Sequence, residues 1–227
     1  MKLNEDRFIE VFFPDAAQLS LLPLTRELLT ELVFNSFTDA SPILIGVNGP
    51  LSTQLMNTAK LLNKDFEILD ANFGSDFRPA QLEKALEAET FSAFLFVETD
   101  PYSGVRLDIV TMAEAIRKTQ PDALILVEGS SALGVQAPLQ IGRDVDVYFA
   151  GLDGSFGVPA GLSLIALSER ANLKTFSGSA AGLMLNFSRQ KQLADRVPLF
   201  ASRLYPQLHA VEKQLDRIFL EGLENRE

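Results

Sequence analysis

The stretch from residue 123 to residue 134 reads Ala-Leu-Ile-Leu-Val-Glu-Gly-Ser-Ser-Ala-Leu-Gly. Its first five residues, Ala123–Val127, are all apolar, which is typical of a strand covered on both faces of a sheet. The run ends at an acidic residue, Glu128, and continues in small residues and glycines. Open α/β sheets bind ligands at the carboxyl ends of their strands, so this stretch predicts both a buried strand and a candidate site.

Similar apolar runs recur along the chain and alternate with segments of helical period. Further strands are predicted at Phe8–Phe13, Ile43–Val47, Phe66–Leu69, Ala93–Val97, Val145–Phe149 and Leu162–Leu167. Helices are predicted at Leu51–Asn63, at Pro79–Ala88 and around the stripe Ile109, Met112, Ala113 and Ile116. Strands alternating with helices predict a three-layer α/β/α fold around a mainly parallel sheet of about seven strands.

The C-terminal part of the chain has a different pattern. Residues 172–182 are rich in Ser, Gly and Ala, which indicates a loop. Apolar residues then recur at helical spacing from Leu204 to Ile218. We therefore expect one large domain over residues 1–203 and a trailing helix over residues 204–227.

Composition excludes several classes of function. The 227 residues include 20 Lys and Arg against 30 Asp and Glu, a net charge of −10 that argues against binding to nucleic acid or anionic membranes. The chain has no cysteine and one histidine, His209, so thiolate metal sites and a Cys nucleophile are excluded and no metal site is expected. No signal sequence or membrane-length apolar run is seen, and a cytoplasmic location is expected.

Three segments combine glycines with polar residues after predicted strands: residues 99–105, 128–134 and 151–162. None of them matches the Walker A, dinucleotide-binding or nucleophile-elbow patterns. Each on its own is also compatible with an ordinary turn and helix cap.

Taken in order, these segments resemble the large domain of the class V aminotransferases, which include the phosphoserine and alanine–glyoxylate aminotransferases. The resemblance rests on Val127–Gly134, on Asp144–Asp146 and on the string Phe156-Gly-Val-Pro-Ala-Gly-Leu162. It implies a fold-type I domain for pyridoxal phosphate (PLP), a subunit that pairs with another, and a small C-terminal domain that is missing from this sequence.

The departures from that family all fall at cofactor positions. The lysine that would form the Schiff base is replaced by Gly154, and the residue before it, commonly Gln, is Asp153. Without an amine at this position the cofactor cannot be held covalently there. The resemblance therefore implies no catalytic residue in this chain.

Three other cofactor positions differ as well. Glu128 stands where a carboxylate keeps the pyridine nitrogen protonated, one methylene longer than the usual Asp. Pro101 replaces the threonine that bonds the phenolic oxygen, and proline has no donor. Ala17, within the stretch 14–18 that we match to the phosphate-binding turn, offers no hydroxyl.

These replacements favour a non-catalytic aminotransferase-like protein that acts as a binding, regulatory or partner subunit, with no cofactor expected. The alternative is an active class V enzyme resembling phosphoserine aminotransferase, which would use PLP. A third hypothesis is a binding module for a small amine, amino acid or sugar nucleotide, contacted by Glu128, Asp153 and Ser155.

Association is expected with a second copy or with an intact paralogue. The expected pairing segments are residues 46–50 and 177–185. Four aromatic residues are candidates for an exposed apolar surface that a partner would cover: Phe34, Phe37, Phe187 and Phe200. The alternative is that they lie in the core. Five lysines are expected on the surface rather than at a site: Lys60, Lys64, Lys84, Lys118 and Lys174.

Overall fold

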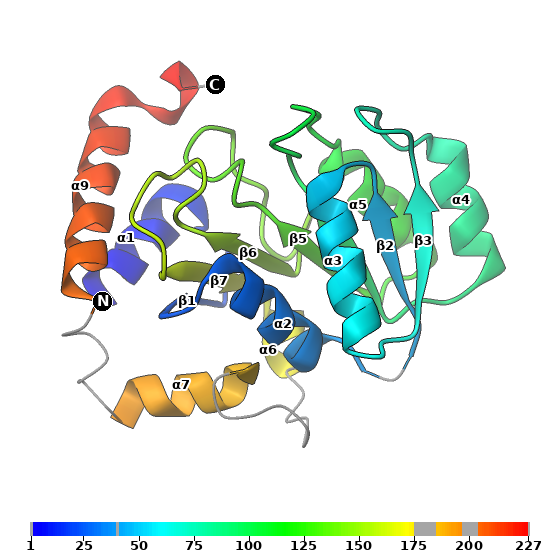
Figure 1. Ribbon diagram of the computed structural model, residues 1–227, viewed down its shortest axis with the longest axis horizontal. Coiled ribbons are helices and arrows are strands. Elements are labelled where there is room, and N and C mark those ends of the chain that lie inside the picture. The colour runs from blue at the N-terminus through cyan, green and yellow to red at the C-terminus, as the bar shows by residue number, and fades with distance from the viewer. Residues whose placement is uncertain (1, 40, 175–184, 197–203, 227) are drawn as a thin grey trace.

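The computed structural model describes residues 2–39, 41–174, 185–196 and 204–226 (Figure 1). Its centre is a seven-stranded sheet in the order β1-β7-β6-β5-β4-β2-β3. The strands are β1 (Gln18–Leu22), β2 (Ile43–Val47), β3 (Phe66–Asp70), β4 (Ala93–Val97), β5 (Leu124–Glu128), β6 (Val147–Gly151) and β7 (Ser163–Leu167). β7 is antiparallel to both of its neighbours, whereas the other neighbouring pairs are parallel, as the sequence predicts.

Helices cover both faces of the sheet and confirm the three-layer α/β/α architecture (Figure 1). One layer contains α1 (Lys2–Phe12), α4 (Pro79–Ala88), α5 (Ile109–Thr119) and α9 (Tyr205–Glu221). The other contains α2 (Arg26–Phe37), α3 (Pro50–Leu61), α6 (Glu169–Leu173) and α7 (Phe187–Arg196).

The central strands are almost entirely apolar because their residues pack against one or the other of these layers. All residues of β4, β5, β6 and β7 are buried. Along β4, Phe94 and Phe96 join the cluster with α5, while Leu95 and Val97 join the cluster with α3. The alternation of side chains along a strand therefore divides the core into two halves.

The predicted first strand, Phe8–Phe13, is wrong. Residues 2–12 form helix α1, and the first strand is Gln18–Leu22 at the edge of the sheet. Phe8 and Phe12 are four residues apart and lie on one helical face, where both rings contact Phe156, with centroids 5.1 and 6.5 Å away. A short apolar run is compatible with the period of a strand and with that of a helix. Here the helical form places Phe8 and Phe12 against Phe156.

The aromatic residues considered as exposed candidates for association lie in the core. Phe34 and Phe37 are each 1% exposed, Phe187 is 2% exposed, and the rings of Phe37 and Phe187 lie 5.8 Å apart. Phe200 lies outside the described residues, as does most of segment 177–185. These phenylalanines join α2 to α7 instead of marking a surface.

The first and last helices lie side by side (Figure 1). Asn4 Nδ2 donates to the carbonyl of Leu208 at 3.0 Å, and Arg7 forms an ion pair with Asp216 at 2.7 Å. The predicted C-terminal helix is thus packed along α1. Among the described residues, no helix has the length and apolar character needed to span a membrane.

Candidate functional site

The three glycine-containing segments meet at the carboxyl edge of the sheet. Residues 99–105 follow β4, residues 129–134 follow β5, and residues 152–162 connect β6 to β7. Pairing of β4 with β5 and of β5 with β6 brings their ends together. The sequence therefore identified the edge of the sheet at which a ligand would be expected.

Two of these segments are joined by a network of hydrogen bonds centred on Ser130. Its carbonyl accepts from the Ser155 amide at 2.8 Å and from the Ser155 hydroxyl at 3.0 Å. Its hydroxyl accepts from the Gly151 amide at 2.8 Å and donates to Glu128. The Ser155 hydroxyl also donates to the carbonyl of Leu133 at 2.9 Å. The turn after β5 is thereby fixed against the turn after β6.

Gly154, which we matched to the family's lysine position from the sequence, lies directly against this contact. A Cβ atom placed on Gly154 would be 2.1 Å from the carbonyl oxygen of Ser130 and 3.2 Å from its Cβ. The first distance is far inside van der Waals contact, and the oxygen belongs to the backbone, so a rotamer change cannot relieve it. The structure thus lacks room for any side chain at position 154.

Glu128 is fully buried at the end of β5. Its Oε1 accepts from the amide of Ser130 at 3.2 Å and from the Ser130 hydroxyl, while Oε2 is buried without a hydrogen-bond partner among the described residues. Burial raises the pKa of Glu128 to about 7 against the lowering effects of Ser130 and of the Arg26 charge. A substantial fraction of this carboxyl is neutral at pH 7.

The other predicted positions are not assembled into a binding set. Pro101 lies in the exposed turn after β4, where it has no donor. Asp153 is exposed, and Ser155 uses its hydroxyl within the network. Of the three residues proposed to hold an amine or hydroxyl ligand, Asp153 is exposed, Ser155 is partly exposed and Glu128 is buried.

Ala17 does not occupy the turn that follows the first strand. It lies just before β1, and its amide donates to the carbonyl of Leu167 at 2.9 Å. The turn that does follow β1 leads through Thr25 into α2. Because the first strand was predicted at Phe8–Phe13, the phosphate-binding position was assigned to Ala17, before the observed first strand instead of after it.

Arg26 was not among the predicted site residues. It lies directly after the turn that follows β1. Arg26 lies in the first turn of α2, where its charge acts on Glu128. Its guanidinium donates to Glu27 at 3.0 Å and to Gln54 at 3.3 Å. A helix start with an arginine is a suitable place for an anion, but no pattern in the sequence connected it to Glu128.

Glu98 and Tyr148 were missed too. The Tyr148 hydroxyl lies 3.0 Å from Glu98 Oε2 and 3.2 Å from the carbonyl of Gly129. Burial raises the pKa of Glu98 to about 7, and it raises that of Tyr148 well above its usual value. The signal was present, because Glu98 follows five apolar residues just as Glu128 does.

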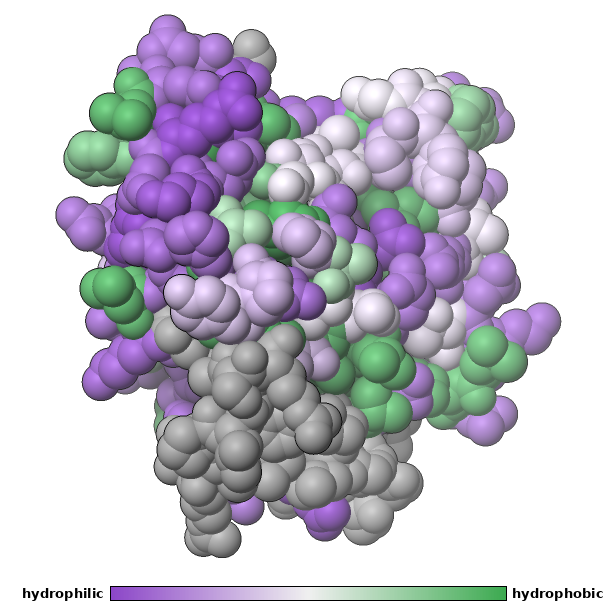
Figure 2. Space-filling view, turned by 60° about the vertical axis from the view of Figure 1, so that its left-hand side comes forward, coloured by the Kyte–Doolittle hydropathy of each residue, from purple (hydrophilic) through white to green (hydrophobic). Residues whose placement is uncertain are grey.

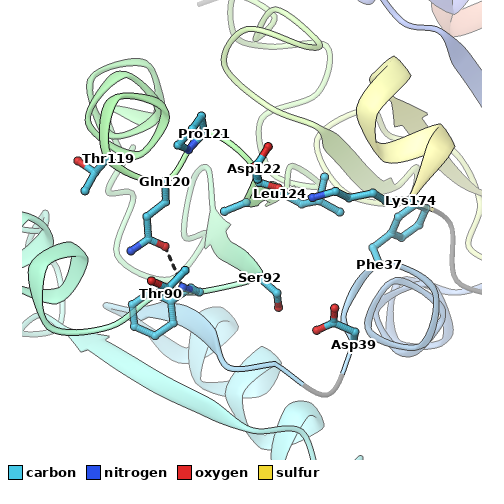
Figure 3. A pocket seen from close by; sticks show the side chains of 12 residues that line it. Phe37, Asp39, Thr90, Ser92, Thr119, Gln120, Pro121, Asp122, Leu124 and Lys174 are labelled. Carbon is cyan, nitrogen blue, oxygen red and sulfur yellow. Dashed lines mark hydrogen bonds between the residues drawn. The ribbon is translucent and has the colours of Figure 1, made fainter.

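A cavity of about 620 Å³ opens at the opposite edge of the sheet, near the starts of β4 and β5 (Figure 3). Its polar side chains are largely engaged: Lys174 donates to the carbonyl of Asp122, and Gln120 bonds the backbone of Phe91, Leu86 and Glu89. This cavity has no contact with the Ser130 network, and its lining serves to join strands to helices.

The lysines are not at the candidate site. Lys60, Lys84 and Lys118 are exposed, as predicted. Lys64 and Lys174 are partly buried, and they donate to the carbonyls of Thr38 and Asp122. In the described ranges, no cluster of His, Cys, Asp or Glu is arranged to bind a metal ion.

No family model matches this chain. Its relatives include a serine–glyoxylate aminotransferase from Methylorubrum extorquens, 26% identical over 84% of this chain and 50% of the relative. An alanine–glyoxylate aminotransferase from Drosophila melanogaster is 28% identical over 60% of this chain and 34% of the relative. The chain spans about half the length, or less, of these curated relatives.

Solved structures show the same relationship in the fold. An alanine–glyoxylate aminotransferase from Nostoc sp. superposes with a TM-score of 0.85 at 21% identity, covering 99% of this chain and 60% of that one. A pyridoxamine–pyruvate aminotransferase from Mesorhizobium loti gives 0.86 at 18% identity, covering 98% and 57%. The homologues and structural neighbours of this chain are class V aminotransferases, and the chain has the fold of a PLP-dependent transferase.

The residues present do not fit covalently held PLP. Position 154, which we matched to the anchoring lysine, has neither an amine nor space for one, because the Ser130 carbonyl lies against Gly154. Pro101 supplies no donor, and Glu128 is enclosed by its own turn. The start of α2 with Arg26 is a group suited to an anionic ligand.

Proposed function

We propose that this aminotransferase-like chain is non-catalytic and acts as a binding, regulatory or partner subunit. The observation that carries the proposal is the contact between Gly154 and the Ser130 carbonyl, at the position where the family holds its lysine. A single lost lysine could follow from a shifted alignment. A glycine whose surroundings leave no space for a side chain supports a site that has been restructured in the absence of the lysine.

The rival function, an active class V aminotransferase, is favoured by the sequence relationship to serine–glyoxylate aminotransferase over 84% of the chain. It would need a lysine near Glu128. The described lysines for which a partner is seen contact groups elsewhere. These pairs are Lys64 with Thr38, Lys174 with Asp122, Lys191 with Gln18 and Lys213 with Asp216. Their positions therefore support the non-catalytic proposal.

Incubation with PLP followed by borohydride reduction tests the proposal directly. We expect no visible band that survives desalting and no stoichiometric adduct by intact mass, because no amine at position 154 can form a Schiff base. A serine–glyoxylate aminotransferase treated in parallel is the positive control. Saturable modification of one lysine at equimolar PLP would contradict the proposal and favour the rival function.

A partner role is the second half of the proposal. The exposed aromatic residues Phe73 and Tyr102 support it, being 66% and 70% exposed on two loops at the carboxyl edge of the sheet. The two loops approach each other, because a Cβ atom placed on Gly74 would lie 3.9 Å from the Cβ of Ser103. Outside the grey region, the face seen in Figure 2 has its apolar side chains in separate patches among hydrophilic ones.

Light scattering measures this association. We expect a mass near twice 25.0 kDa at micromolar concentration, falling toward 25.0 kDa in the variant Phe73→Ser/Tyr102→Ser. Leu173→Ser, which removes an exposed apolar residue of α6, is the matched control. A constant mass of 25.0 kDa across a dilution series would exclude the homodimer and leave only a different protein as partner.

A further inference from the structure

A second polar group lies on the face of the sheet that Glu128 does not face. Glu98 follows β4, and its bond to Tyr148 places its side chain in the layer of α1 and α5. Glu98 lines a cavity of about 280 Å³ beside the first turn of α5. Glu128 interacts instead with Arg26 in the opposite layer. The side chains of Glu98 and Glu128 therefore lie on opposite faces of the sheet.

The carboxyl group of Glu98 is incompletely satisfied. The residue is 2% exposed, and its Oε2 accepts from Tyr148 at 3.0 Å. Its Oε1 accepts no hydrogen bond from any described residue, although it is not among the atoms sealed from solvent. A buried carboxylate with a free oxygen is stabilised by a group that brings both a donor and a positive charge.

The rest of the lining determines which kind of cation fits. Leu107, Ile109 and Leu139 give the interior an apolar wall, while the exposed Asp76 and Asp108 lie at its rim. Arg106 also lines the cavity, so the side chains together carry three carboxyl groups and one guanidinium. Asp76 and Asp108 use oxygens to accept from Phe77 and Thr111, but their charges still favour a cation at the entrance.

We propose that the cavity beside Glu98 binds a small primary alkylammonium ion, with the ammonium on the Glu98 carboxylate and the alkyl chain against Leu107, Ile109 and Leu139. A hydrated metal ion would leave the apolar wall unused. An anion would meet three carboxyl groups against one guanidinium. An organic cation of a few carbon atoms matches both the negative charge of the carboxyl groups and the apolar wall of the cavity.

Binding is expected to strengthen as the pH rises from 6 to 8. The charged and titratable groups around Glu98 are Tyr148 of β6, Arg106 and Asp108 before α5, Asp76 before α4 and Glu128 of β5. Burial raises the pKa of Glu98 to about 7, so the ionised fraction increases about tenfold over this range. The apparent affinity increases in proportion to that fraction.

The experiment is a titration of the full chain with n-butylammonium chloride, in which binding is monitored by amide chemical shifts in a ¹⁵N spectrum. Sodium chloride is the salt control. Saturable shifts are expected around residues 98 and 107–110, with affinity about tenfold weaker at pH 6 than at pH 8. Glu98→Gln should weaken binding at least tenfold. Glu114→Gln, which removes an exposed carboxylate from the same helix α5, should leave it unchanged.

Two further arms keep the proposal falsifiable if Glu98→Gln folds poorly. Val110→Phe narrows the cavity from its partly exposed rim and should also weaken binding. The zwitterion 4-aminobutyrate should bind more weakly than n-butylammonium, because Asp76 and Asp108 repel its carboxylate. Unsaturable shifts, equal affinity in Glu98→Gln and Glu114→Gln, or tighter binding of the zwitterion would each overturn the assignment.

Discussion

Replacing Gly154 by lysine is expected to destabilise the fold by about 3 kcal/mol or more, and to leave the chain without transaminase activity. The cause is steric: the new Cβ would lie 2.1 Å from the carbonyl oxygen of Ser130. To accept it, the backbone of the 129–134 turn must move, and the bonds from Ser155 and Gly151 to Ser130 are strained or lost. Chemical denaturation measures the stability change.

Gly104→Ala is the matched control. Gly104 has a φ of +72° and nothing within 4 Å of a built Cβ, so its substitution carries the cost of a positive φ, about 1 kcal/mol, without a clash. Gly154→Ala should therefore cost clearly more than Gly104→Ala. Equal stability of the two variants, or transamination of any common amino acid by Gly154→Lys, would show that the Ser130 contact does not close the family's lysine position.

The stability of the protein should decrease on the order of 3 kcal/mol between pH 4.5 and pH 7 through Glu128 alone. The unfolded chain releases this proton near pH 4.5, whereas burial keeps the folded carboxyl protonated up to a pKa of about 7. Between these values the folded state binds more protons than the unfolded state, so stability falls as the pH rises. The decrease continues through pH 7, where the folded carboxyl is half ionised, and it ends about one pH unit higher. Glu98 is expected to act in the same direction, since burial raises its pKa to about 7 as well.

Denaturation curves at pH 4.5, 6 and 8 test this expectation. The stability of wild type relative to Glu128→Gln should decline across the series, because glutamine does not titrate. Glu114→Gln, an exposed carboxylate, should run parallel to wild type. If Glu128→Gln also runs parallel to wild type, the carboxyl is ionised in the folded state near its ordinary pKa, and the enclosed site described above is wrong.

The amino-acid sequence by itself determined the central part of the fold. Strands such as Ala93–Val97 and Ile43–Val47 were predicted with the observed bounds, and β5 was predicted within one residue. Their apolar runs result from burial on both faces, a constraint that acts on every residue of the strand. The family resemblance followed from the same region, because the turns after buried strands have little freedom in sequence.

The start of the chain was decided by tertiary contacts. Phe8–Phe13 reads equally as strand or helix, and packing of Phe8 against Phe156, 148 positions away in the chain, accompanies the helical form. The edge strand Gln18–Leu22 is only partly buried, so it lacked a continuous apolar run. A local pattern cannot report a partner that is distant in sequence.

The same division holds at the candidate site. The resemblance predicted that Gly154 stands at the family's lysine position, a prediction about residue identity alone. Only the structure showed that the Ser130 carbonyl fills the space, and that Glu98 and Glu128 enter opposite layers although each ends an apolar strand. Those facts depend on which turns and helices meet across the sheet. The alternation of side chains and the order of the strands bring them together, and both become definite only when the chain has folded.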